Sequence, residues 1–146
     1  MQQTNQTAPK IKKIKLDFKD SKYATGRRKR SIARVWLKKG SGNIHVNGLK
    51  MNEYFKRPVH QIIVTRPLEI SQVTSNYDVK CSVKGGGLSG QSGAIILGIS
   101  KALIAHDENL KKNLKKDKLT TRDSRVVERK KYGHRKARRS FQFSKR

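Results

Sequence analysis

Acidic side chains are scarce in this chain. Ten aspartates and glutamates stand against 36 lysines and arginines among 146 residues, so the formal net charge is +26. Charge of one sign repels itself in a compact monomer unless a counter-charge is present, so we expect a polyanionic partner, either a nucleic acid or an anionic membrane surface. The lone cysteine, Cys81, excludes an internal disulfide framework and a cysteine zinc site. The four histidines are too scattered to predict a metal site.

Long apolar runs are missing as well. The longest patch, residues 94–99, is far shorter than the roughly 18 apolar residues that indicate a spanning helix. Residues 1–22 hold six lysines and two aspartates. They have neither the apolar stretch of a secretory signal nor the arginine-rich, acid-poor composition of a transit peptide, so we expect the chain to stay where it is made.

Charge and hydrophobic pattern divide the chain into three zones. We predict a flexible lysine-rich extension over residues 1–22, a globular domain over 23–119 and a basic extended tail over 120–146. The tail from Arg122 to Arg146 carries eleven cations and two acids, a net charge of +9 (11 − 2). Within the domain, alternating apolar residues predict strands over 31–37, 44–46 and 78–83.

Apolar residues at helical spacing predict the rest of a small α+β domain. We expect a short helical turn at 51–55, a helix that starts at Pro58 and is ended or bent by Pro67, the best helix over 89–106, and another helical stretch over 109–119. In the second of these, Val59, Ile62 and Ile63 are at helical spacing. In the third, one stripe holds Ile95, Ile99, Ala102 and Leu103.

A glycine-rich stretch, residues 85–93, separates the last predicted strand from the best helix. It admits three interpretations: a tight turn with close packing, a nucleotide-cradling loop, or contact with an RNA backbone phosphate. We favour the turn over the nucleotide loop, because the Walker pattern needs a lysine and residues 85–93 contain none. We also expect Gly87→Val to be more damaging than Ser82→Ala, since a β-branched residue cannot readily adopt a glycine turn conformation.

Two basic segments could bind a polyanion. The run from Arg27 to Arg30 leads into a strand, so we expect it to be held by ordered structure. The alternative is a localisation signal or a solvated run of charges. The tail interleaves arginines and lysines with aromatic residues, which suits phosphate clamping and base stacking, although a disordered solubilising tail would look similar. The sequence gives little support for a catalytic site. We expect Cys81 to be buried and inert, and no catalytic partner can be named for His60 as a base.

Four ordered stretches resemble the family of the ninth protein of the small ribosomal subunit. They are the glycine signature from Gly85 to Ile95 with its continuation from Gly98 to Leu103, the opening stretch 24–35, the late segment 119–133, and the ending Gln142 to Arg146. The resemblance covers about residues 23–146. It departs at Ile96 and Leu97, where bacterial relatives commonly carry Arg-His, so we do not carry RNA contacts over to these two positions.

The resemblance implies a four-stranded sheet backed by helices with a left-handed βαβ crossover. It also implies a structural, non-enzymatic role in the head of the small subunit, with 16S-type ribosomal RNA and neighbouring head proteins as partners. It implies no cofactor, metal, membrane or small-molecule substrate. The ribosome would be in the bacterial cytoplasm, with a mitochondrial or plastid matrix as the alternative. The last two residues, Lys145 and Arg146, would reach the peptidyl-site transfer RNA.

Charge pattern and resemblance together predict the RNA-binding residues. These are Arg27, Arg28, Lys29, Arg30, Arg34, Gly85, Gly86, Gly87, Gln91, Arg122, Arg125, Arg129, Lys130, Lys131, Arg135, Lys136, Arg138 and Arg139. The runner-up is a phosphate-handling enzyme built on the glycine loop, which specific ATP binding that survives high salt would favour. A polybasic protein of the membrane surface ranks last, because no amphipathic helix with a broad apolar face carries the charges.

Overall fold

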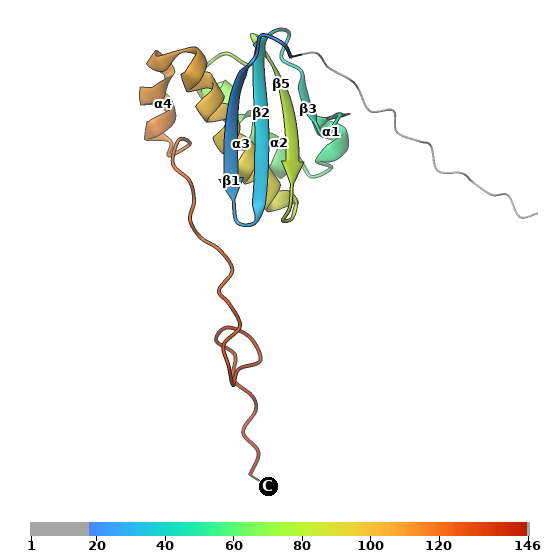
Figure 1. Ribbon diagram of the computed structural model, residues 1–146, viewed down its shortest axis with the longest axis vertical. Coiled ribbons are helices and arrows are strands. Elements are labelled where there is room, and N and C mark those ends of the chain that lie inside the picture. The colour runs from blue at the N-terminus through green and yellow to red at the C-terminus, as the bar shows by residue number, and fades with distance from the viewer. Residues whose placement is uncertain (1–17, 146) are drawn as a thin grey trace, which may run out of the picture.

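A five-stranded sheet carries the fold in the computed structural model, which describes residues 18–145 (Figure 1). The order across the sheet is β1-β2-β5-β3-β4. Strands β3 and β5 are parallel, and the other neighbouring pairs are antiparallel. The strands are β1 (Lys22–Arg28), β2 (Ser31–Lys39), β3 (Ile44–Val46), β4 (Leu49–Lys50) and β5 (Tyr77–Lys84).

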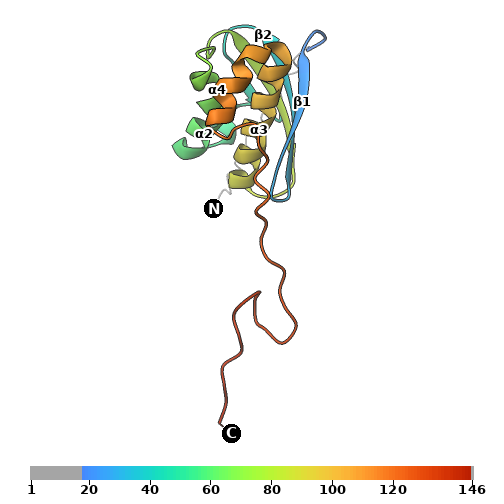
Figure 2. The same cartoon turned by 90° about the vertical axis from the view of Figure 1, so that its left-hand side faces the viewer.

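Helices cover one face of this sheet, and the other face is open in the two ribbon views (Figures 1 and 2). The helices are α1 (Met51–Tyr54), α2 (Pro58–Ile70), α3 (Leu88–His106) and α4 (Lys111–Lys116), with a 3-10 turn at Glu108–Leu110. The mixed α+β class is therefore confirmed. The sheet has five strands where we expect four, because Asn47 and Gly48 both adopt positive φ and turn the chain back into the short strand β4.

The core lies between the sheet and α3, as the alternation predicts. In β2, Ala33, Val35 and Leu37 are fully buried, whereas Ile32 and Arg34 are exposed. The predicted stripe of α3 is fully buried too. Residues of α2, α4 and the loop after α1 complete the core, and its largest fully buried side chains are Phe55, Leu37, Leu68, Ile95, Ile99, Leu103 and Leu114.

Of the two outcomes expected at Pro67, the end of the helix is wrong, since α2 continues to Ile70 with Pro67 buried inside it. The side that faces the core is also different: α2 buries Val64, Pro67 and Leu68, while Val59 and Ile62 are more than 60% exposed. The proline ring packs against the core, and this burial offsets the backbone hydrogen bond that proline cannot donate.

Helix α3 lies very close to strands β1 and β2. A Cβ added at Gly26 would run into the backbone of α3 at Ala94, and one at Gly98 would meet the side chain of Val35. By length and composition α3 could cross a membrane, but 61% of its most apolar 18-residue window is buried in the protein. A central helix that is covered on several sides needs the same apolar composition.

Candidate nucleic-acid interface

The run of cations from Arg27 to Arg30 forms the tip of the β1–β2 hairpin. Arg28 pairs with Ser31 in the sheet, so Lys29 and Arg30 make a two-residue turn in which Lys29 has a φ of 51°. Lys29 and Arg30 are exposed at this tip. The turn therefore projects two cations from one end of the sheet, next to the glycine turn after β5.

Hydrogen bonds inside the protein hold the glycine turn. Gly85 and Gly86 have φ values of 74° and 60°. The Gly85 carbonyl accepts from Ser31 Oγ at 3.0 Å and from Gln91 Nε2 at 3.1 Å. The other end of the Gln91 amide accepts from Tyr54 Oη at 2.7 Å. The side chain of Gln91 thus holds the turn in place, which the sequence alone did not indicate.

Gly87 corrects the expectation about this turn. Its φ is −108°, and nothing lies within 4 Å of where its Cβ would be. A side chain at Gly87 is therefore compatible with the fold, and the backbone conformation that requires glycine belongs to Gly85 and Gly86. The open space beside Gly87 leaves its backbone accessible from outside.

An open cleft of about 660 Å³ joins the hairpin tip, the glycine turn and the C-terminal segment. Six predicted RNA-binding residues line it, namely Lys29, Arg30, Gly86, Gly87, Arg129 and Lys130. Val126, Val127 and Glu128 complete the wall. Four cations face one acid, so the cleft is suited to an anionic ligand.

Asp123 anchors the beginning of the C-terminal segment. Its carboxylate pairs with Arg28 of β1 at 3.3 Å and with Arg125 at 2.8 Å, and it also accepts from the backbone N–H of Arg125 at 3.0 Å. Hydrogen bonds from Arg125, with a smaller contribution from the charge of Arg28, hold the pKa of Asp123 well below its usual value. Arg28 therefore positions the segment, and its aliphatic part lies over Gly93 of α3.

Beyond this anchor, residues 124–145 extend away from the domain without a helix or a regular strand (Figures 1 and 2). One loop interrupts the extended course, where His134 and Ser140 form a β-bridge. Glu128 binds Arg138 at 2.9 Å and Lys131 at 3.7 Å. The aromatic rings of this segment are mostly exposed, and Tyr132 is fully so.

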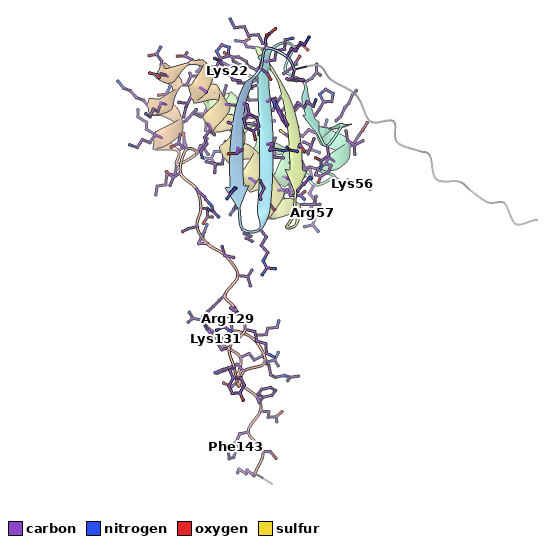
Figure 3. All side chains as sticks on the ribbon, in the orientation of Figure 1. Lys22, Lys56, Arg57, Arg129, Lys131 and Phe143 are labelled. Atoms are coloured by element: carbon purple, nitrogen blue, oxygen red, sulfur yellow. The ribbon has the colours of Figure 1, made fainter. Side chains whose placement is uncertain are left out.

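Two further cations, Lys56 and Arg57, lie at the same end of the domain (Figure 3). They occupy the connection between α1 and α2 and are both exposed. The charge pattern did not single them out, because they stand as a pair between apolar residues. Their position beside the end of β5 adds a second basic loop to that of the hairpin.

The predicted residues thus fall into separate groups. Arg28 and Gln91 make contacts within the domain, and Arg125 is exposed but paired with Asp123. Arg34 lies on the open sheet face, with its guanidinium 5.8 Å from the ring centre of Trp36. Arg146 lies outside the described residues, and so does most of the predicted N-terminal extension. Besides Arg125, the exposed cations of the described C-terminal segment are Arg122, Arg129, Lys130, Lys131, Arg135, Lys136, Arg138, Arg139 and Lys145.

A comparison with protein-family models gives a match over residues 26–146, to the family described as ribosomal protein S9/S16. The match includes the end of β1 with the tip of the β1–β2 hairpin, the glycine turn and the whole C-terminal segment.

Proposed function

This chain belongs to the ribosomal protein S9/S16 family, whose members are structural proteins of the small ribosomal subunit that bind ribosomal RNA. We propose that the end of the domain with the β1–β2 hairpin tip and the C-terminal segment together hold 16S-type RNA in the head of that subunit. The family is not an enzyme family. The observation that carries the proposal is the cleft that brings Lys29, Arg30, Arg129 and Lys130 together from two distant parts of the chain.

Electrostatics supports a folded RNA as the ligand. Phosphates of adjacent RNA helices repel one another, and basic loops that fill the crevice between them neutralise that repulsion. An RNA backbone could approach the exposed backbone of Gly87 at the mouth of the cleft, where no side chain stands in the way.

Salt dependence of RNA binding tests this role for the cleft. The double variant Lys29→Gln with Arg30→Gln should bind a 16S-type ribosomal RNA transcript more weakly. It should also lower the slope of log K against log salt by about 0.7–0.9 for each phosphate that the variant no longer binds. Lys111→Gln with Lys112→Gln, which removes two exposed cations of α4, is the matched control. Equal slopes and affinities for the two variants would contradict the proposal.

The end of the chain has a separate proposed partner. The C-terminal segment reaches the peptidyl-site transfer RNA, where Lys145 and Arg146 bind anticodon-stem phosphates. Support comes from the resemblance and from the extended course of the C-terminal segment, which runs far from the domain. Arginine offers a planar fork for phosphate oxygens, and lysine offers a point charge.

Deleting Ser144 to Arg146 tests this contact. Subunit assembly should be unaffected, while transfer RNA binding at the peptidyl site should weaken by about 1–3 kcal/mol, the worth of a hydrogen bond to a charged group. Filter binding to purified subunits over a salt series measures both the affinity and its slope. Unchanged affinity and slope, with normal incorporation of the shortened chain, would show that the segment does not touch transfer RNA.

The remaining proposals concern the setting. Neighbouring head proteins are partners, and the ribosome is that of the bacterial cytoplasm, with an organellar matrix as the alternative.

The crossover from β3 through α1 and α2 to the parallel strand β5 is proposed to be left-handed. The position of the helices on one face of the sheet supports this proposal.

A further inference from the structure

The face of the sheet opposite the helices carries an unusual set of side chains. Four residues from neighbouring strands pair in register and form one row across the sheet. Tyr23 of β1 lies beside Trp36 of β2, which lies beside Lys80 of β5, which lies beside His45 of β3. In Figure 1 this face is turned toward the viewer, and no helix lies over it. Two aromatic rings and a cation thus lie in one row on this side of the sheet, and the ring centre of Phe18 lies 5.7 Å from the ammonium of Lys80.

The geometry of this row suits flat ligands. The rings of Tyr23 and Trp36 are 5.3 Å apart between centroids and are tilted by 47°. Tyr23 is 50% exposed. The guanidinium of Arg34 lies 5.8 Å, and the ammonium of Lys80 5.9 Å, from the ring centre of Trp36, so cations flank the indole.

The charge of the face selects an anion. Five cations occupy the outward positions of β1, β2 and β5, against a single acid, Asp78 of β5. That carboxylate accepts hydrogen bonds from the backbone N–H groups of Ser41 and Asn43 at 3.0 and 2.8 Å, so it is used by the β2–β3 turn. The five cations are Arg27, Arg34, Lys38, Lys80 and Lys84.

We propose that this open sheet face is a second RNA-binding surface, on which Tyr23 and Trp36 stack the bases of a single-stranded segment of ribosomal RNA and the flanking cations bind its phosphates. Sheet platforms with exposed aromatic residues bind single-stranded RNA in this way, because splayed-out bases offer their flat faces for stacking. The inference rests on the proposed function for the class of ligand. It assigns to the sheet a site that is distinct from the cleft at the hairpin tip.

Trp36 is the only tryptophan of the chain, so its fluorescence reports on this face alone. In a titration of the full chain with a single-stranded RNA oligonucleotide, base stacking should quench the Trp36 emission in a saturable manner. A duplex RNA of the same length should bind the basic loops and the C-terminal segment but leave that emission unchanged. Quenching by both RNAs to the same extent would overturn the proposal.

Variants separate the sheet from the other basic surfaces. Tyr23→Ser should weaken the binding that quenches Trp36 by about 5-fold to 150-fold, which corresponds to about 1–3 kcal/mol per stacked base. Tyr132→Ser removes a fully exposed ring from the C-terminal segment and should leave the quenching curve unchanged. Because Tyr23 lies on an edge strand, the thermal midpoint of each variant is measured by circular dichroism, and Arg34→Gln provides a second variant that leaves both rings in place.

Four outcomes distinguish the explanations. Loss of quenching affinity in Tyr23→Ser and Arg34→Gln, with folding intact, supports the proposal. RNA binding that neither quenches Trp36 nor responds to these variants overturns it and leaves the proposed function standing. Quenching that appears only after residues 1–17 are deleted overturns the proposal, because it would show that this segment, and not RNA, occupies the sheet face in the full chain. A full chain that binds no RNA at all contradicts the proposed function itself.

Discussion

Replacing Gly85 with alanine should destabilise the domain strongly. Gly85 has a φ of 74°, a left-handed conformation that costs an L-residue about 1–2 kcal/mol. The added Cβ would also lie 2.5 Å from the carbonyl oxygen of Arg30, which is backbone in the hairpin turn and cannot rotate away. Such crowding costs about 1–3 kcal/mol, so the total loss is about 2–5 kcal/mol.

Equilibrium unfolding in urea measures this loss on the full chain, in moderate salt that screens the self-repulsion of its charge. With a slope of about 2 kcal/mol per M, the midpoint should fall by about 1 M or more. The matched control is Gly87→Ala, two residues along the same turn. It meets open space at a φ of −108°, so its free energy of unfolding should stay within about 0.5 kcal/mol of the parent chain.

Two results would refute this reasoning. Equal midpoints for Gly85→Ala and Gly87→Ala would show that the turn relaxes without cost. A larger loss of unfolding free energy for Gly87→Ala than for Gly85→Ala would show that the strained position is Gly87 and not Gly85. If Gly87→Ala folds normally but binds ribosomal RNA more weakly, the open space beside Gly87 is where the RNA backbone approaches.

Three further predictions concern single side chains. The pKa of Asp78 lies below its usual value of 3.8: desolvation raises it, but hydrogen bonds from Asn43 and Ser41 lower it by more. Asp78→Ala should therefore cost about 1–3 kcal/mol at neutral pH, and the difference from the parent chain should vanish in urea titrations as the pH falls through the folded-state pKa, below about 4. Gln91→Ala removes the hydrogen bond from Gln91 to the Gly85 carbonyl and the one that Gln91 accepts from Tyr54, and it should cost about 1–3 kcal/mol of unfolding free energy in the same assay; a loss below the error of the measurement would count against that role. Burial raises the pKa of the Cys81 thiol, so a thiol reagent should label it only when the domain unfolds; labelling of the folded chain at the rate of a small thiol would contradict this.

Much of the fold is predictable because it depends on local pattern. Alternation in residues 31–37 predicts β2 and its buried side, and the apolar stripe from Ile95 to Leu103 predicts the core face of α3. Asn47-Gly48 indicates the end of a strand, but not the turn that adds β4, since two paired residues leave no periodic signal. Charge and the order of the motifs are sufficient to predict the family.

The composition alone determined that the partner is a polyanion, because 36 cations against ten acids remain charged in any fold. Tertiary structure alone decided which of these cations are available. Arg28 is held by Asp123, which is far away in sequence, while Lys29 beside it is exposed at the lip of a cleft that the C-terminal segment completes. In the same way, the apolar pattern of α2 did not show that Val59 and Ile62 would stay exposed. Periodicity reveals that a segment is amphipathic, but the side that becomes buried depends on which distant segment packs against it, and that choice is made only when the whole chain folds.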